Sequence, residues 1–137
     1  MTPALLKHIL VVDDNADDRA QLRSQLLRGS DQRWRFTEAA TGRAALQALK
    51  DIEPASFDCV LLDYYLPDMD AQEVLNALCE PSGHTPCPVL VVTGGLAQDG
   101  QRLMRAGAQD YISKAWTKPQ SLSRAVDNAM ERFAMQQ

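Results

Sequence analysis

Five side chains suited to metal or phosphoryl chemistry stand at the ends of short apolar runs in this chain. Asp13 and Asp14 follow the first run, Asp63 ends a second, Thr93 ends a third, and Lys114 follows a fourth. Three neighbouring carboxylates resist joint ionisation, and a hard divalent cation such as Mg²⁺ relieves that conflict through oxygen ligands. One aspartate can then serve as a nucleophile toward a phosphoryl group, while the cation and a lysine neutralise the phosphoryl oxygens.

These side chains can act together only if the elements that carry them bring the ends of the runs to one place. Buried apolar runs alternate with helical patterns five times along the chain. Strands are expected at residues 7–14, 34–39, 57–63, 89–93 and 110–113. Helices are expected from the cap Asn15 to Gly29, around 45–52 and 71–78, over 97–106, and from Pro119 for about 18 residues.

Alternating strands and helices with continuously apolar strands predict a parallel sheet that is covered on both faces. Because crossovers are right-handed, few topologies remain. We expect an α/β fold, a flavodoxin-like (βα)5 doubly wound parallel sheet with strand order 2-1-3-4-5. That order places strands 1, 3, 4 and 5 side by side, and ligands of such sheets lie beyond the carboxyl ends of the strands. The five polar side chains should therefore meet in one patch.

Composition narrows the class of protein. The length of 137 residues predicts one domain, residues 1–137, with no output domain within it. A net charge of −4 argues against direct nucleic-acid binding. No apolar run approaches the ~20 residues of a membrane span, and the start lacks a secretory signal, so we expect a cytoplasmic protein that does not bind membranes. Three cysteines without a CxxC pair favour reduced thiols over a zinc site.

Short motifs link these positions in a fixed order. They are Val11-Val12-Asp13-Asp14, Leu61-Leu62-Asp63, Leu66-Pro67-Asp68, Val91-Val92-Thr93-Gly94, Gly107-Ala108, and Asp110-Tyr111 leading to Lys114. From Lys7 to about Phe133, this ordered set resembles the receiver domain of bacterial two-component response regulators. The resemblance implies that Asp63 accepts a phosphoryl group from the phosphohistidine of a sensor histidine kinase or a histidine phosphotransfer protein.

The resemblance also implies a metal site. Asp14 and Asp63 would bind Mg²⁺ directly, together with the backbone carbonyl of Tyr65, and Asp13 would act partly through water. Such a domain is not a metabolic enzyme, but it catalyses its own phosphorylation and dephosphorylation at Asp63.

A conformational switch is implied as well. Thr93 and Lys114 would contact the phosphoryl group, and Tyr111 would change rotamer as Thr93 moves toward it. Such coupling is a population shift between two pre-existing states. A downstream protein partner, or the next protein of a phosphorelay, would recognise the shifted state.

The sequence departs from the family pattern at Ala115 and at Asp70-Ala71, and Gly94 bears on access to the site. Ala115 follows Lys114 where proline is usual, and a non-proline cis bond costs about 2.5–4 kcal/mol, so we expect a trans bond. Asp70-Ala71 replaces the usual Asp-Gly pair, which alanine can do if Asp70 caps the third helix. Gly94 is small, which predicts a phosphoryl site open to water or to a partner.

Two other functions stay open at this point. One is a phosphorylation-independent, receiver-like interaction module. The other is a phosphatase or phosphotransfer enzyme with an aspartyl nucleophile, although such enzymes commonly need a second acid where this chain has Tyr65. A homodimer also stays open, because the last helix carries an apolar stripe that continues to Phe133 and Met135.

Overall fold

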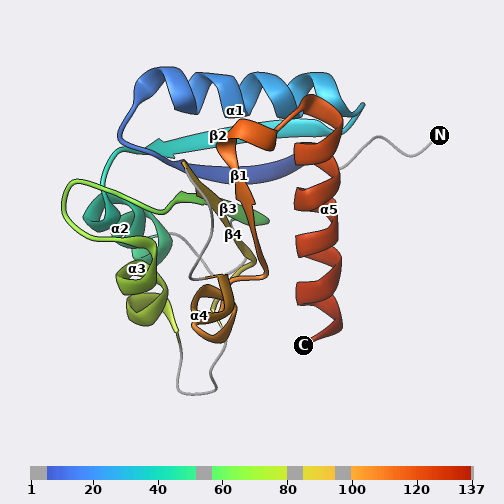
Figure 1. The fold of residues 1–137 in the computed structure, drawn as a ribbon. Coiled ribbons are helices and arrows are strands. Elements are labelled where there is room, and N and C mark those ends of the chain that lie inside the picture. Colours follow the sequence, from blue (N-terminus) through green and yellow to red (C-terminus); the bar gives the residue numbers. More distant parts are fainter. Residues whose placement is uncertain (1–5, 52–56, 80–84, 95–99, 137) are drawn as a thin grey trace.

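A computed structural model of the protein describes residues 6–51, 57–79, 85–94 and 100–136. Strands and helices alternate along the chain (Figure 1). The elements are β1 (Leu6–Val12), α1 (Ala16–Gly29), β2 (Arg33–Ala39), α2 (Gly42–Asp51), β3 (Cys59–Asp63), α3 (Ala71–Leu78), β4 (Val89–Thr93), α4 (Gly100–Arg105), β5 (Asp110–Ser113), the 3-10 helix η1 (Lys114–Trp116) and α5 (Pro119–Met135).

The five strands form one parallel sheet in the order β2-β1-β3-β4-β5. This confirms the expected flavodoxin-like α/β fold and its strand order. β1, β3 and β4 are flanked by strands on both sides, and their apolar residues are buried except Leu6 at the start of β1. Polar residues that follow these strands therefore lie at the edge of a buried sheet.

The helices cover both faces of the sheet and create two separate apolar clusters. α1 and α5 pack on one face through Leu22, Leu26, Leu122 and Val126. α2, α3 and α4 cover the opposite face, where Ala45, Val74, Leu75 and Leu103 are buried. Alternate residues of β1 enter the two clusters, as the period of a strand requires. None of the described helices is both long enough and apolar enough to span a bilayer.

Two glycines end helices for different reasons. Gly107 has a φ of +117° after α4, and the N–H groups of Gly107 and Ala108 donate to Met104 and Leu103 in a Schellman motif. Gly29 ends α1 as expected, but a Cβ atom at Gly29 would overlap the carbonyl group of Pro119. The close approach of α1 and α5 therefore explains this glycine. The expected start of α4 at residue 97, and Ile52 of the second helix, lie outside the described residues.

The three cysteines are free thiols. Cys59 and Cys87 are buried in the two apolar clusters, and burial raises the pKa of the Cys87 thiol to about 12. Both therefore behave as small apolar side chains.

Candidate functional site

The carboxyl ends of four neighbouring strands bring together the polar side chains that the sequence singles out. Asp13 follows β1, Asp63 and Thr93 are the last residues of β3 and β4, and Lys114 follows β5. One carboxylate oxygen from each of Asp13, Asp14 and Asp63 lies within 4.8 Å of the others. The predicted convergence of these carboxylates is therefore present.

Asp13 is fixed by the turn between β1 and α1. Its side chain is buried, and Oδ1 accepts a hydrogen bond of 2.9 Å from the backbone N–H of Asn15. Arg19 Nη1 donates to the backbone carbonyl of Asp13 at 2.6 Å, and the same guanidinium pairs with Glu38 on β2. Asn15 caps α1 by accepting from the backbone N–H of Asp18, as predicted for this cap. The second Asp13 oxygen, Oδ2, is left facing the site.

The surroundings of Asp63 disfavour the ionised form of its carboxyl group. Only 7% of the residue is exposed, and burial is the main cause that raises its pKa to about 6. The neighbouring carboxylate of Asp13 raises the pKa of Asp63 further, while Lys114 offsets part of the increase. This is the conflict between crowded carboxylates that the sequence predicts.

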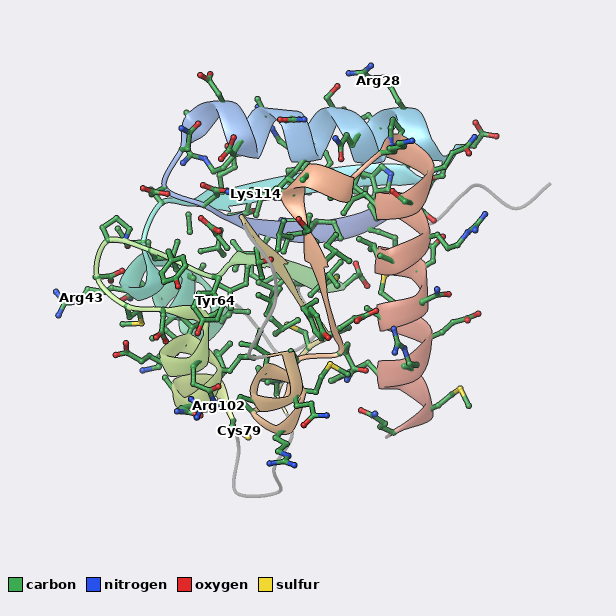
Figure 2. All side chains as sticks on the ribbon, viewed as in Figure 1. Arg28, Arg43, Tyr64, Cys79, Arg102 and Lys114 are labelled. Atoms are coloured by element: carbon green, nitrogen blue, oxygen red, sulfur yellow. The ribbon has the colours of Figure 1, made fainter. Side chains whose placement is uncertain are left out.

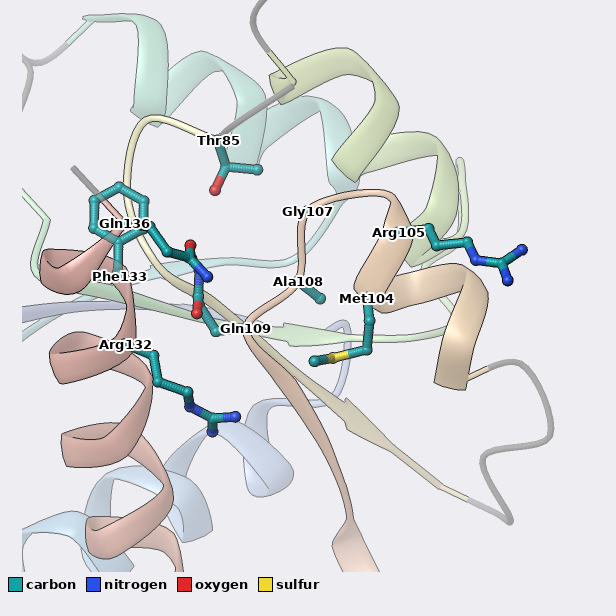
Figure 3. A pocket seen from close by; sticks show the side chains of 9 residues that line it. All are labelled: Thr85, Met104, Arg105, Gly107, Ala108, Gln109, Arg132, Phe133 and Gln136. Carbon is teal, nitrogen blue, oxygen red and sulfur yellow. The ribbon is translucent and has the colours of Figure 1, made fainter. Parts of the chain in front are cut away.

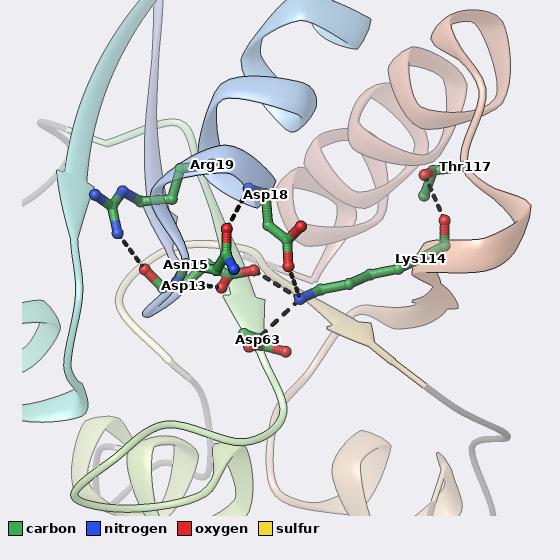
Figure 4. A network of polar contacts seen from close by, with 7 residues as sticks. All are labelled: Asp13, Asn15, Asp18, Arg19, Asp63, Lys114 and Thr117. Carbon is green, nitrogen blue, oxygen red and sulfur yellow. Dashed lines mark hydrogen bonds and ion pairs between the residues drawn. The ribbon is translucent and has the colours of Figure 1, made fainter.

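Lys114 lies at the centre of the acidic group. Its Nζ atom is 2.8 Å from Asp13 Oδ2, 3.0 Å from Asp18 Oδ2 and 3.5 Å from Asp63 Oδ2 (Figure 4). Burial alone would lower the pKa of Lys114, but the hydrogen-bonded carboxylates of Asp13 and Asp18 hold it above its usual value. The lysine is therefore charged and stays among the acids.

Three arginines labelled in Figure 2 are placed differently from Lys114. Arg28, Arg43 and Arg102 are exposed, whereas Lys114 Nζ lies among the acids. Asp18 also contacts Lys114, although it is not among the site residues expected from the sequence. A signal for it was available, because side chains in a first helical turn lean back toward the preceding strand end.

The segment after Lys114 has the trans Lys114–Ala115 peptide expected from the missing proline. The backbone continues into η1, and Thr117 Oγ1 donates a hydrogen bond of 2.9 Å to the carbonyl of Lys114. Gln25 Nε2 of α1 donates in turn to the carbonyl of Thr117 at 3.4 Å. Side chains therefore hold the backbone of Lys114 in this segment, which has alanine where the family pattern has proline.

The loop after β3 carries Tyr65, whose backbone carbonyl is one of the expected metal ligands. Tyr65 and Asp70 form an isolated antiparallel bridge. Its hydrogen bonds run from Leu66 N–H to the Met69 carbonyl and from the N–H of residue 71 to the Tyr64 carbonyl. Neither bond uses the carbonyl of Tyr65, so this oxygen can serve as a ligand without breaking the bridge.

Asp70 caps α3, as expected from the Asp70-Ala71 pair. Its carboxylate accepts from the backbone N–H of Glu73 at 2.9 Å, and the Glu73 carboxylate accepts from Asp70 N–H at 3.4 Å. Ala71 is the first residue of α3 and is fully buried. Alanine therefore fits at this position without a left-handed backbone.

Thr93 and Tyr111 lie on the same face of the sheet. Thr93 pairs with Ser113 and Tyr111 with Val91 in the β4–β5 register, so both side chains face α4. Thr93 is 6% exposed, and the half-buried ring of Tyr111 covers the backbone of Gly100 so closely that a Cβ atom there would overlap it.

Gly94, the residue after Thr93, has open space around its Cα atom. A Cβ atom built on Gly94 would meet no atom of a described residue within 4 Å. The described residues therefore leave room for a side chain at this position.

A cavity of about 290 Å³ lies elsewhere, at the amino end of β5 between the carboxyl ends of α4 and α5 (Figure 3). Two of its lining side chains bond to each other, because Gln109 Nε2 donates to Gln136 Oε1 at 3.0 Å, and lining Arg132 pairs with the nearby Asp110 at 3.2 Å. It is at the opposite edge of the sheet from Asp63, so it does not belong to the acidic site.

The fold and the site together define a class of signalling domain. A family model of the response regulator receiver domain matches residues 9–127. The chain therefore belongs to the response regulator receiver family.

Two named relatives are similar in sequence to this chain over most of its length. The two-component response regulator ORR5 of Oryza sativa subsp. japonica is 32% identical over 118 residues, which are 85% of this chain and 84% of that protein. The transcriptional regulatory protein KdpE of Mycobacterium tuberculosis is 34% identical over 118 residues, but these are only 48% of its length.

Solved receiver structures have the same fold. A CheY-like receiver domain protein from Methanospirillum hungatei JF-1 has a TM-score of 0.77 at 25% identity, with 97% of this chain and 100% of that chain covered. The receiver domain of the response regulator NarL from Mycobacterium tuberculosis has a TM-score of 0.77 at 26% identity, with coverages of 94% and 98%.

Proposed function

We propose that this protein is a phosphoacceptor switch in which Asp63 receives a phosphoryl group from a phosphohistidine. The donor is a sensor histidine kinase or a histidine phosphotransfer protein. The main support is the carboxylate of Asp63, which lies 7% exposed beside two further acids and 3.5 Å from a charged lysine. Membership of the receiver family supports the same role.

Mg²⁺ is the cofactor that this donor set fits. Asp14 and Asp63 would bind it directly with the carbonyl of Tyr65, and Asp13 would act partly through water. Mg²⁺ prefers oxygen ligands and often binds one or two carboxylates. The three carboxylates would supply such oxygens, because one oxygen from each lies within 4.8 Å of the others. When bound, the cation supplies positive charge to the carboxylates and the phosphoryl oxygens.

The residues then divide the chemistry between them. A carboxylate oxygen of Asp63 attacks phosphorus, the bond from phosphorus to the imidazole nitrogen breaks, and the imidazole leaves with the bonding pair. The ammonium of Lys114 pairs with a phosphoryl oxygen, and the hydroxyl of Thr93 donates to another. Hydrolysis reverses the outcome, because water attacks phosphorus and releases phosphate and the Asp63 carboxylate.

The switch is the movement of Thr93 toward the phosphoryl group, followed by a rotamer change of Tyr111. The two side chains share one face of the sheet on adjacent strands, which supports this coupling. The ligand can shift the population only by the difference in its affinity for the two states. The changed surface is recognised by a downstream protein or by a second copy of the chain.

The test is chemical labelling. Acetyl phosphate with Mg²⁺, or a phosphorylated kinase, should label the wild-type protein in intact mass spectrometry, and Asp63→Asn should stay unlabelled. A known receiver domain serves as the positive control. If that control is labelled and the wild-type protein is not, the phosphoacceptor function is wrong, and a phosphorylation-independent interaction module is favoured.

A further inference from the structure

Three carboxylates surround the single ammonium group of Lys114. Lys114 Nζ lies 2.8 Å from Asp13, 3.0 Å from Asp18 and 3.5 Å from Asp63. A lysine ammonium has three donors and no further capacity. Its weakest contact is the one with Asp63, which is the longest of the three distances. Asp18, not Asp63, therefore receives the better hydrogen bond.

Asp18 approaches the lysine from a different direction than the strand-end acids. It lies in the first turn of α1, and its backbone N–H is held by the side chain of Asn15 at 3.0 Å. Figure 4 shows Asp18 and Asp63 on opposite sides of Lys114 Nζ. The Asp18 side chain is 39% exposed, against 1% for Asp13. Asp18 is therefore the more exposed of these two partners of Lys114. Breaking its contact with the lysine costs less free energy than breaking the contact with Asp13, because it leaves no buried carboxylate without a counter-charge.

We infer that Asp18 is a positioning residue that holds Lys114 back from Asp63 and so slows phosphoryl transfer. The inference rests on the proposed phosphoacceptor function. A phosphoryl group on Asp63 adds oxygens that pair with the ammonium, and Nζ must then move toward them from its present position 2.8 Å from Asp13 and 3.0 Å from Asp18. Because Asp13 is buried and needs its counter-charge, the contact given up is the one with Asp18.

The structure offers a matched control for this idea. Asp17 is the neighbouring residue in the same first turn of α1, carries the same charge and is exposed. Asp17→Asn and Asp18→Asn remove equal charge and equal helix-dipole stabilisation. Of these two aspartates, Asp18 is the one in contact with Lys114.

The first measurement is the labelling rate with acetyl phosphate at saturating Mg²⁺. Asp18→Asn should label roughly two- to fivefold faster than wild type, as expected for loss of one partly exposed ion pair, and Asp17→Asn should label at the wild-type rate. The same pair is compared in a Lys114→Gln background, where Asp18→Asn should have no effect, because it acts through the lysine. Equal rates for Asp18→Asn and Asp17→Asn, or an Asp18→Asn effect that persists without Lys114, would overturn the inference.

A second measurement does not depend on phosphorylation. In unphosphorylated protein, ¹⁵N NMR of the Lys114 ammonium should change in Asp18→Asn and stay unchanged in Asp17→Asn. If the wild-type protein cannot be labelled, the phosphoacceptor function fails, and with it the effect on rate. If wild type is labelled but the Lys114 ammonium signal is the same in Asp18→Asn and in wild type, only the role of Asp18 is refuted.

Discussion

The crowded carboxylate of Asp63 should make the metal-free protein less stable than a variant without that charge. The pKa of Asp63 rises from 3.8 to about 6 on folding. At 1.36 kcal/mol per unit, an increase of about two units corresponds to roughly 3 kcal/mol of unfavourable free energy for the ionised form. Two effects make the gain in stability smaller than this: the site is open to solvent, and Lys114 loses an ion-pair partner in the variant. We therefore expect the free energy of unfolding of Asp63→Asn to exceed that of wild type by about 1–2 kcal/mol at pH 7.5 in EDTA.

The pH dependence gives this prediction its sign. A carboxyl group whose pKa is higher in the folded state binds more protons when folded, so the wild-type protein loses stability as pH rises from about 4 to about 6. The advantage of Asp63→Asn should therefore be largest above pH 6 and disappear near pH 4.

Urea denaturation followed by circular dichroism at pH 4.5 and 7.5 measures both effects. The exposed Asp31, in the turn between α1 and β2, supplies the control Asp31→Asn, which should show no such gain. Mg²⁺ at ten times its dissociation constant should stabilise wild type by about 1.4 kcal/mol and the Asp63→Asn variant by less, so the gap should narrow. A metal-free Asp63→Asn that is less stable than wild type at pH 7.5, or a gain independent of pH, would refute the reasoning.

Three further predictions concern the surroundings of the site. Gly94→Met should lengthen the lifetime of the aspartyl phosphate by obstructing water, while Gly94→Ala should not, because a Cβ alone meets no described neighbour within 4 Å; equal lifetimes for the methionine variant and wild type would contradict the open site. Gly100→Ala should displace the ring of Tyr111, shift its NMR signals and cost about 1–3 kcal/mol in unfolding free energy; unchanged ring signals would show that the ring has no fixed place. Trp34→Phe should cost about 1–3 kcal/mol in urea denaturation, because the buried indole N–H donates at 3.1 Å to the carbonyl of Leu26 near the end of α1; a loss below about 0.5 kcal/mol, taken as the limit of a surface substitution, would argue against that bond.

The fold and the meeting of the acids could be predicted because both follow from strand order. Once apolar runs and helical faces indicate a parallel sheet, the ends of adjacent strands must lie together, and with them Asp13, Asp63 and Thr93. The departure at Ala115 was also predictable, because the cost of a cis bond is local.

Contacts between side chains of different elements were harder to predict. The partnership of Asp18 with Lys114 depends on how α1 leaves β1 and on which torsions a long side chain adopts. The role of Gly29 depends on the distance between two helices whose sequences are about 90 residues apart. No local pattern encodes such distances.

The fixed backbone of Lys114 has a consequence for the order of events in time. Thr117 holds the carbonyl of Lys114, and Gln25 holds that of Thr117, so the ammonium can exchange partners only by rotation within its own side chain. Such rotations in partly exposed side chains take picoseconds to nanoseconds, whereas rearrangements of loops and helices take nanoseconds to milliseconds. We expect the lysine to have re-paired long before Tyr111 and its neighbours finish moving. The ion pairs in the site would then form first. The surface that a partner recognises would change afterwards, in a slower and separate step.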